Sequence, residues 1–339
     1  MEKRKSEIMK TINLKKYFPV QKSFLDRLLA KELEYVHAVD DVSFSIREGE
    51  VFCLVGESGC GKSTTGYLIV RLLEPTSGRI IYNGIDITKL EGNELRVLRK
   101  EIQIIFQDPY ASLNPRMKIG DIIKHPLDIH DIGTPRERTQ KVYEILRSVG
   151  LYPPERFYDK YPHQLSGGQR QRVAIARSLI LEPRFVVADE PTSMLDVSVQ
   201  AEIVNLMLHM KKKYNLTYLY ITHDFGIASQ ICDRIAVMYL GKIVEIGRRE
   251  EILRTPRHPY TIALLTSIPG RKTLRKRLII GEEVPNAIKI PSGCRFHNRC
   301  PYIKDVCKEE EPELRKISET HYAACHFIEK IKEEWPRLY

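Results

Sequence analysis

The chain has 339 residues, which exceeds one typical domain, and we expect a main domain with a smaller appendage. Hydrophobic residues make up 42% of the chain, which is enough to bury a core and argues against wholesale disorder. The 54 basic and 44 acidic residues leave a formal net charge of +10, but the two signs are interspersed, which favours a well-solvated surface over a nucleic-acid or anionic-membrane partner.

Membrane and export signals are missing from the sequence. No stretch approaches the roughly 18–20 consecutive apolar residues that span a bilayer. Met1–Lys10 is basic, and no apolar segment follows it, so we expect no signal peptide and a cytoplasmic location. Seven cysteines are an odd number for a disulfide framework, and in a reducing compartment clustered cysteines indicate metal binding or catalysis.

Apolar runs alternate with helical patterns as far as about residue 250, which predicts an α/β fold. Five of these runs are predicted strands, the last two forming a hairpin around Gly241: Val51–Val55, Phe185–Ala188, Thr217–Ile221, Ile235–Tyr239 and Lys242–Ile246. Polar residues follow the first three, at the strand ends where open α/β sheets bind ligands.

The region from Pro109 to Leu165 is helical in pattern, which predicts a helical subdomain, at about 109–180, inserted into the sheet domain. After about residue 255 the composition changes. Five prolines interrupt this segment and four cysteines follow, so residues 256–339 are predicted to form a separate C-terminal module.

One glycine-rich segment fits the phosphate-loop pattern GxxxxGK[ST], between a predicted strand and a predicted helix. Its residues are Gly56, Glu57, Ser58, Gly59, Cys60, Gly61, Lys62 and Ser63. The glycines allow backbone N–H groups to surround phosphate oxygens, and the helix that follows points its positive end at the same anion. Lys62 would contact the outer phosphates and Ser63 would ligate Mg²⁺, so the loop predicts ATP binding.

An acidic pair follows the apolar run Phe185–Ala188. Asp189 at the strand end can hold the Mg²⁺ shell, and Glu190 can act as a general base on the attacking water. An acidic pair after a strand is weak evidence alone, but together with the phosphate loop it predicts ATP hydrolysis.

The segment Leu165-Ser166-Gly167-Gly168-Gln169 places Ser166–Gly168 at the N-terminus of a predicted helix, Gln169–Ile180. A helix N-terminus binds anions, so this is a second phosphate-binding device in one chain. It is redundant in a monomer. It makes sense if two such domains dimerise head to tail and each lends this helix end to the ATP of the other.

These motifs, in this order, resemble the nucleotide-binding subunits of ABC transporters over residues 8–255. The resemblance implies a P-loop ABC-type ATPase domain with a mixed sheet and a helical subdomain. It also implies nucleotide contacts and roles for further residues. Phe18, rather than Tyr17, would stack on adenine, Gln107 would contact Mg²⁺ or water, His223 would contact the γ-phosphate, and Thr64 and Gln169 would complete the contacts. Ser193–Asp196 resembles the loop through which dimer partners meet, with Met194 where alanine is more common.

Two longer segments are similar to the oligopeptide and dipeptide importer subfamily. They are Gln107–Pro115 and His258-Pro259-Tyr260-Thr261. The insertion Gln21–His37 is similar to the second of the two ATPase paralogues in such importers. The resemblance therefore implies a motor on the cytoplasmic face of the membrane, paired with a paralogous ATPase, two permease subunits and, indirectly, an extracytoplasmic solute-binding protein. The solute itself (dipeptide, oligopeptide, nickel or oligosaccharide) is not encoded in this chain.

Four cysteines lie close together near the C-terminus, with five, six and seventeen residues between them: Cys294, Cys300, Cys307 and Cys325. Soft thiolates in a short module suggest a metal site. The spacing lacks the C-x₂-C knuckles of common zinc sites and is not a standard ferredoxin run. The resemblance implies a structural [4Fe–4S] cluster, with Zn²⁺ and free buried thiols as the alternatives. His297, His321 and His326 are alternative ligands.

The other three cysteines have different settings. Cys53 on a predicted strand and Cys232 in a helical stretch are interpreted as packing residues. Cys60 lies in the phosphate loop near a helix N-terminus, which we expect to lower the pKa of its thiol and make it reactive.

Two other function classes are weighed against an importer motor. Chromosome-maintenance and repair ATPases insert long coiled coils or zinc modules between the phosphate loop and Asp189, where this chain has only about 125 residues without sustained heptads. We therefore expect no nucleic-acid partner. A nucleotide-holding subunit without catalysis is disfavoured because Lys62, Glu190 and His223 are all present.

Overall fold

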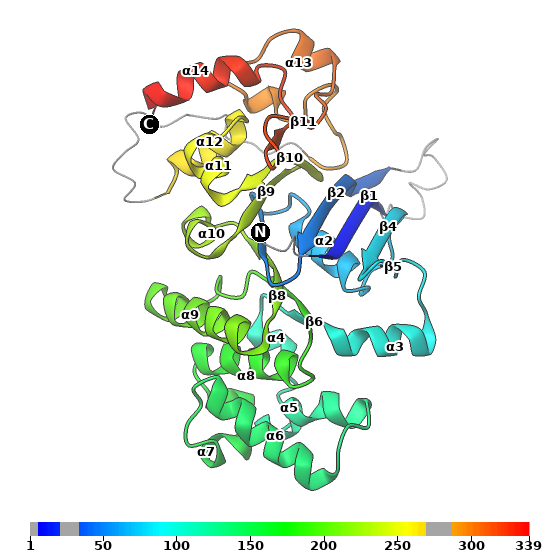
Figure 1. The fold of residues 1–339 in the computed structure, drawn as a ribbon, viewed down its shortest axis with the longest axis vertical. Coiled ribbons are helices and arrows are strands. Elements are labelled where there is room, and N and C mark those ends of the chain that lie inside the picture. Colours follow the sequence, from blue (N-terminus) through cyan, green and yellow to red (C-terminus); the bar gives the residue numbers. More distant parts are fainter. Residues whose placement is uncertain (1–5, 21–33, 269–285, 339) are drawn as a thin grey trace, which may run out of the picture. The chain divides into compact units, whose positions relative to one another are not determined.

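The computed structural model, drawn in Figure 1, describes residues 6–20, 34–268 and 286–338. These residues fall into two compact units. Unit 1 comprises Met1–Ser6, Arg47–Val51 and Lys89–Ile221, and unit 2 comprises Glu7–Ile46, Phe52–Thr88 and Thr222–Tyr339. Most of the insertion at 21–37 lies outside the described residues. All five predicted strands are present, each end within two residues of its expected position.

Unit 1 contains three parallel strands, β6 (Ile102–Ile105), β7 (Phe185–Asp189) and β8 (Thr217–Thr222). The central strand is β7, with Phe185 opposite both Ile102 and Thr217. All five residues of β7 are buried. A strand covered on both faces is apolar throughout, which explains the uninterrupted hydrophobic run before Asp189.

Helices account for most of unit 1 and confirm the helical character predicted between Pro109 and Leu165 (Figure 1). α5 and α6 pack against α8, and α7 packs against α5. α6 begins with a capping box, in which Thr134 and Glu137 satisfy each other's backbone N–H groups, and Pro135 occupies its first position. The bounds are α3 (Gly92–Glu101), α4 (Pro109–Ser112), α5 (Ile119–Ile129), α6 (Pro135–Ser148), α7 (Glu155–Tyr158), η1 (Pro162–Gln164), α8 (Gly167–Leu179) and α9 (Val197–Tyr214).

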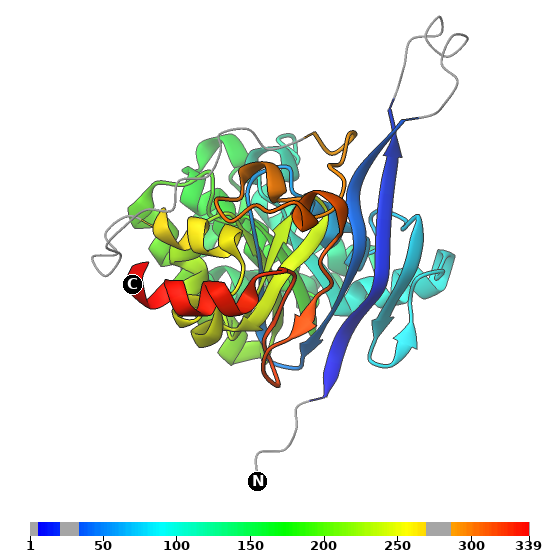
Figure 2. The same ribbon diagram turned by 90° about the horizontal axis from the view of Figure 1, so that it is seen from above.

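Unit 2 contains an antiparallel sheet in the order β2-β1-β4-β5. Its two longest strands, β1 (Glu7–Pro19) and β2 (Tyr35–Arg47), run side by side in Figure 2. β4 (Ser77–Tyr82) pairs with β1 on one edge and with the short β5 (Ile85–Asp86) on the other. Ile8, Met9, Thr11 and Leu14 of β1 are buried, and its remaining residues are partly or fully exposed.

The other strands of unit 2 form a mixed arrangement. β3 (Val51–Val55) runs parallel to β9 (Arg234–Tyr239), and β9 pairs antiparallel with β10 (Lys242–Arg248). Two short C-terminal strands, β12 (Tyr322–Ala323) and β11 (Arg315–Lys316), continue the order beyond β10. The helices are α2 (Lys62–Ile69), α10 (Phe225–Ile231), α11 (Arg249–Arg254), α12 (Pro259–Thr266), η2 (His297–Arg299), α13 (Val306–Glu309) and α14 (Ile328–Leu338). The C-terminal segment is therefore joined by backbone pairing to the β9–β10 hairpin.

Candidate functional site

The phosphate loop connects β3 to α2 in unit 2, as the sequence predicts. Gly61 caps α2 with φ of 106°, a backbone conformation that favours glycine. A Cβ atom at Gly56 would collide with the carbonyl oxygen of Met238, and one at Gly61 with that of Ala38. The two glycines are therefore required by the close approach of neighbouring backbone, which gives the loop a fixed path into the helix.

Lys62 is 4% exposed and its ammonium group lies against the loop. Its Nζ donates hydrogen bonds to the carbonyl oxygens of Gly56, at 2.8 Å, and of Glu57, at 3.0 Å. The loop thus holds the cation beside the N-terminus of α2, which adds positive potential at the same place. This combination of a fixed cation and a helix N-terminus suits a phosphate group.

Cys60 does not have the reactive thiol that the sequence suggested. Its side chain is 2% exposed, and burial raises the pKa of the thiol to about 11. The charge of Lys62 acts in the opposite direction but is the smaller effect. The prediction of a lowered pKa is therefore wrong, because desolvation outweighs the helix N-terminus and the neighbouring cation.

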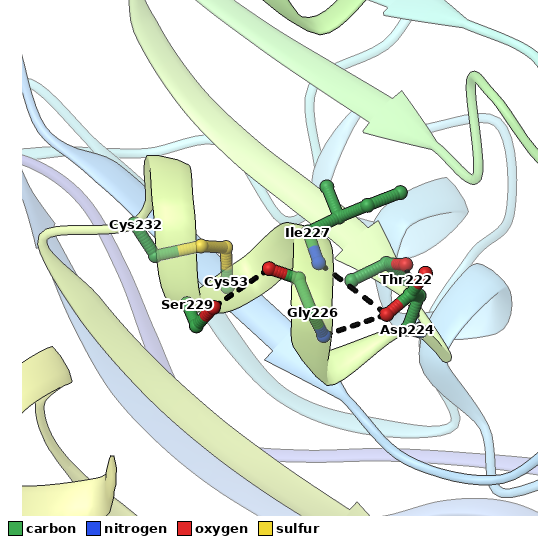
Figure 3. Close-up of a disulfide and its surroundings, with 7 residues drawn as sticks. All are labelled: Cys53, Thr222, Asp224, Gly226, Ile227, Ser229 and Cys232. Carbon is green, nitrogen blue, oxygen red and sulfur yellow. Dashed lines mark hydrogen bonds between the residues drawn. A yellow bond between two sulfur atoms is a disulfide. The ribbon is translucent and has the colours of Figure 1, made fainter. Parts of the chain in front are cut away.

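Cys53 and Cys232 form a disulfide between β3 and the end of α10 (Figure 3). Both residues are buried, as the packing interpretation required, but they are bonded to each other instead of packing as free thiols. The disulfide connects the strand that leads into the phosphate loop with the helix that follows His223. At the other end of α10, the Asp224 carboxylate accepts hydrogen bonds from the N–H groups of Gly226 and Ile227 (Figure 3).

Unit 1 brings Gln107 and Glu190 together. Nε2 of Gln107 lies 3.4 Å from Oε2 of Glu190, immediately beyond the ends of β6 and β7. Asp189, the last residue of β7, is fully buried, and the N–H of Glu190 donates to the carbonyl oxygen of Ile221 at 3.0 Å. Glu190 has a φ of 42°, and non-glycine residues rarely adopt positive φ. Such strained positions cluster at functional sites.

Ser166 caps α8 through a capping box with Gln169. Its Oγ accepts from the N–H of Gln169 at 3.3 Å, and the side chain of Gln169 accepts from the N–H of Ser166 at 3.1 Å. Ser166 is exposed, and Gly167 and Gly168 are partly exposed. The predicted helix N-terminus is present, with an accessible first turn on a helix of 13 residues.

Two arginines on α8 hold the segment that follows Gln107. Arg170 lies 4.0 Å from the centre of the Tyr110 ring and donates to the carbonyl oxygen of Pro162 at 2.6 Å. Arg177 donates to the carbonyl oxygen of Ser112. The sequence analysis did not identify these arginines, although their seven-residue spacing places them on one face of the helix. The helix that carries Ser166 and the Gln107 segment are thus packed together within unit 1.

Phe18 and Tyr17 have different surroundings near the end of β1. The hydroxyl of Tyr17 donates to Asp40 at 2.5 Å, and its ring packs on His37 with centroids 4.2 Å apart. Burial, reinforced by Asp40, raises the pKa of Tyr17. The partly exposed ring of Phe18 has the ammonium of Lys16 at 5.1 Å. The contacts of Tyr17 favour Phe18 as the ring that stacks on a base.

The four C-terminal cysteines form one group. The N–H of Cys294 donates to the carbonyl oxygen of Cys307 at 2.8 Å. Burial raises the pKa of Cys325 to about 12, and the other three cysteines each add to the rise. Backbone N–H groups reach three of the sulfurs, those of Cys294, Cys300 and Cys325. These interactions indicate four neighbouring thiols in the C-terminal part of unit 2.

The described residues form no metal site. Within the described residues, no three His, Cys, Asp or Glu side chains are arranged to hold one metal ion. The three histidines considered as alternative ligands bond elsewhere: His297 Nδ1 to the carbonyl oxygen of Cys294, His321 Nε2 to Glu245, and His326 Nε2 to the carbonyl oxygen of Glu310. The four thiols are therefore the donor set that the sequence suggests, without a metal-binding arrangement in the described residues.

Comparison with known proteins identifies the family. The ABC transporter family matches residues 39–193, and the C-terminal region of the oligopeptide/dipeptide transporters matches residues 244–307. The chain is 47% identical to the oligopeptide transport ATP-binding protein AppF of Bacillus subtilis, over 94% of this chain and 97% of that protein. This chain belongs to the ATP-binding subunits of the ABC transporter family, in the oligopeptide/dipeptide group. It is also 44% identical to the dipeptide transport ATP-binding protein DppF of Haemophilus influenzae, over 96% and 98% of the two chains.

Solved structures agree with this identification. The ATP-binding cassette MJ0796, a dimer bound to ADP and phosphate, matches with a TM-score of 0.61 and 32% identity, over 71% of this chain and 98% of that one. CbiO1 of Clostridium perfringens, part of an ABC transporter complex, matches with a TM-score of 0.61 and 30% identity, over 76% and 95%. This ABC subunit is accordingly an ATPase with a mixed sheet and helices. None of the helices in the described parts of the chain is long and apolar enough to span a membrane.

Two contacts of this ABC subunit were not predicted from the sequence. Tyr260 and Arg299, both from the C-terminal part of unit 2, bond to Glu57 of the phosphate loop. Tyr260 lies in the motif His258–Thr261, which indicated the subfamily but not this contact. Arg299 directly precedes Cys300, and no pattern in the sequence distinguishes it from other arginines.

Proposed function

We propose that this chain is the motor of a peptide importer and that Gln107 and Glu190 stand at its hydrolytic centre. The observation that carries the assignment is the 3.4 Å contact between the Gln107 amide and the Glu190 carboxylate, with Glu190 at a positive φ directly after the buried Asp189. Relatives at 44–47% identity are named as oligopeptide and dipeptide transport proteins, which supports peptides as the solute class.

We assign the nucleotide to the loop Gly56–Ser63. Its phosphates would bind Lys62 and the backbone N–H groups of the loop as far as Thr64. Its adenine would stack on the ring of Phe18. Mg²⁺ would be held by Ser63, Asp189 and Gln107. These donors are all oxygens, the ligands that Mg²⁺ prefers, and Asp189 offers its carboxylate at a fully buried strand end. When bound, Mg²⁺ neutralises charge on the phosphates.

Glu190 is assigned as the general base. Its carboxylate takes a proton from the water whose oxygen attacks the γ-phosphorus. The bond from that phosphorus to the β–γ bridging oxygen breaks, and ADP leaves with the electron pair. Gln107 Nε2, beside the carboxylate, orients it and the water. His223 is exposed directly after β8 and is assigned to the γ-phosphate.

The test is Glu190→Gln, measured by phosphate release and by nucleotide binding in the same preparation. We expect turnover to fall by about 10²- to 10⁴-fold while ATP binding is retained. Glu202→Gln is the matched control, because Glu202 is an exposed acidic residue of unit 1 that pairs with Arg172. If Glu190→Gln keeps turnover within about tenfold of the wild type, the base assignment is wrong.

We propose that each ATP site is completed by a partner subunit. The exposed, capped N-terminus of α8 at Ser166–Gly168, with Gln169, would bind the phosphates of ATP held by the partner. Met194, in the loop Ser193–Asp196, and Val197 are 56% and 81% exposed, which is unusual for large apolar side chains and fits a contact surface. The partner is proposed to be a paralogous ATPase.

Sedimentation of Glu190→Gln with ATP tests the choice of partner. Alone, this variant should remain monomeric, and it should form a dimer when the paralogue is added. Dimerisation of the chain alone would contradict the heterodimer and support a homodimer.

The remaining partners are proposed to be two permease subunits, with an extracytoplasmic solute-binding protein acting through them and with no nucleic acid. The segment 107–115 would transmit motion to the permeases, since Arg170 and Arg177 join it to the helix that begins after Ser166. We propose that the chain lies on the cytoplasmic face of the membrane, where it would contact these permeases. We assign the ATPase domain to residues 8–255, with its helical subdomain at about 109–180, and the C-terminal module to 256–339.

We propose that Cys294, Cys300, Cys307 and Cys325 bind a [4Fe–4S] cluster, with Zn²⁺ as the alternative. The support is the group of four thiols and the N–H groups that reach three of the sulfurs. The cluster would cross-link the C-terminal module.

Iron and labile sulfide analysis of anaerobically purified protein tests the cluster. Four of each per chain, with absorbance near 400 nm, is the expected result, and Cys300→Ala should lose both. Stoichiometric zinc without that absorbance would contradict the cluster in favour of the alternative.

A further inference from the structure

Glu57, the second residue of the phosphate loop, forms a salt bridge with an arginine from the C-terminal module. Arg299 Nη1 lies 2.7 Å from Oε2 of Glu57, and Nη2 lies 2.9 Å from Oε1. The two parallel hydrogen bonds form a bidentate pair, the strongest and most directional kind of carboxylate contact. Arg299 is 7% exposed, so the pair is shielded from solvent on the arginine side.

Tyr260 holds the backbone of the same residue. Its hydroxyl oxygen accepts a hydrogen bond from the N–H of Glu57 at 2.8 Å, and Tyr260 is fully buried. The motif around Tyr260 fixes its position. Pro259 begins α12, and Nδ1 of His258 caps the helix by accepting from the N–H of Tyr260 at 3.1 Å. The motif His258–Thr261, which is typical of the subfamily, therefore positions the Tyr260 side chain against the phosphate loop.

The carbonyl group of Glu57 completes the connection, because it accepts a hydrogen bond from Nζ of Lys62 at 3.0 Å. One residue is thus held at its carboxylate by Arg299 and at its N–H by Tyr260, and it bonds Lys62 through its carbonyl oxygen. A shift of Glu57 would move the carbonyl that holds the phosphate-binding ammonium group.

Arg299 is itself positioned by the cysteine segment. It is the last residue of η2 and is followed directly by Cys300. Its guanidinium lies 5.8 Å from the centre of the Tyr239 ring and 6.0 Å from that of Phe296. Because Arg299 and Cys300 are consecutive, a constraint on the backbone of Cys300 also constrains the backbone from which the Arg299 side chain reaches Glu57. All of these contacts lie within unit 2.

We infer that Arg299 and Tyr260 are positioning residues for ATP, which act through Glu57 on Lys62, and that the cysteine segment and the ATP site are thermodynamically linked through them. This inference rests on the proposed binding of ATP at the loop. It gives the C-terminal module a role in nucleotide affinity in addition to any role in stability.

Binding of a fluorescent ATP analogue to the purified full chain tests the inference. Arg299→Gln, Tyr260→Phe and Glu57→Gln should each weaken binding by roughly 2- to 30-fold, the range of indirect coupling effects. Lys242→Gln is the matched control. It removes an ion pair that joins β10 to Glu311 of the C-terminal module and leaves the contacts of Glu57 with Arg299 and Tyr260 intact, so its affinity should match the wild type.

A double-mutant cycle separates positioning from a general loss of structure. Arg299→Gln combined with Glu57→Gln should weaken binding no more than the stronger single change, because both remove the same contact. Additive losses, or lower melting temperatures with unchanged affinity in all three variants, would overturn the inference. Failure of the wild type to bind the analogue would instead overturn the proposed ATP site.

Linkage must be reciprocal, which provides a second readout. ATP should slow amide hydrogen exchange at 295–300 in the wild type and in Lys242→Gln, but not in Glu57→Gln, whose substitution lies outside the module. Glu57 is partly exposed, so this variant should fold even if Arg299→Gln does not. Equal protection by ATP in the wild type and Glu57→Gln would overturn the link.

Discussion

The imidazole of His321 and the carboxylate of Glu245 form a buried pair, with Nε2 2.7 Å from Oε1. Glu245 lies on β10 and is fully buried, and its two oxygens also accept from the N–H groups of Arg257 and His258. Three partners satisfy a carboxylate that burial would otherwise penalise. One side chain therefore fixes both the start of α12 and the loop before β12, which connects the C-terminal segment to the hairpin.

We expect His321→Ala to destabilise the protein by about 1–3 kcal/mol, because it leaves one oxygen of a buried carboxylate without its side-chain partner. Urea unfolding measures the change. His326→Ala is the control, since that imidazole bonds only a backbone carbonyl in a more exposed position. Equal midpoints for the two variants would contradict the importance of the Glu245–His321 pair.

The disulfide between Cys53 and Cys232 spans 179 residues of sequence. Cross-linking a long loop restricts the unfolded chain, and the usual gain is about 2–4 kcal/mol. We expect Cys232→Ala to melt several degrees below the wild type under oxidising conditions, and reductant to lower the wild type to the same temperature. Mass spectrometry of unreduced peptides identifies the bond. A melting temperature that does not respond to reductant would show that the two thiols are unpaired in solution.

The strands and the capped helix α8 could be predicted because their signals are local. Phe185–Asp189 is apolar throughout as a result of burial on both faces, and Ser166 with Gln169 is a capping box that can be recognised from the sequence. The contact of Arg299 with Glu57 joins residues 242 positions apart, and no local pattern encodes such a pair. The same holds for the pairing of Cys53 with Cys232, since sequence alone does not determine disulfide connectivity.

The chemistry of Cys60 shows why a local rule failed. Position next to a helix N-terminus predicts a reactive thiolate, but that rule applies to thiols that solvent can reach. With Cys60 2% exposed and its pKa raised to about 11 by burial, iodoacetamide at pH 7.5 should leave Cys60 unmodified in the folded chain and label it after unfolding in urea. Peptide mass spectrometry measures both states. Rapid labelling of the folded chain, with protection by ATP, would restore the original expectation.

His258 should make stability depend on pH. Burial lowers the pKa of His258 from 6.5 to about 3, so the imidazole stays neutral in the folded chain and its Nδ1 can accept from Tyr260. Between those two values the unfolded chain binds a proton that the folded chain does not, and stability therefore falls as pH falls below about 6.5. From pH 6.5 to 4.5 the loss from this residue is about 2–3 kcal/mol.

His258→Asn tests this dependence, since asparagine is a good N-cap but does not titrate. Urea midpoints at pH 7.0 and 4.5 should differ less for His258→Asn than for the wild type, while His125→Asn, at an exposed position on α5, should keep the wild-type difference. The same loss on acidification in His258→Asn as in the wild type would show that other groups carry the effect. A smaller loss would show that the buried imidazole, which positions Tyr260 against the phosphate loop, is what limits stability in acid.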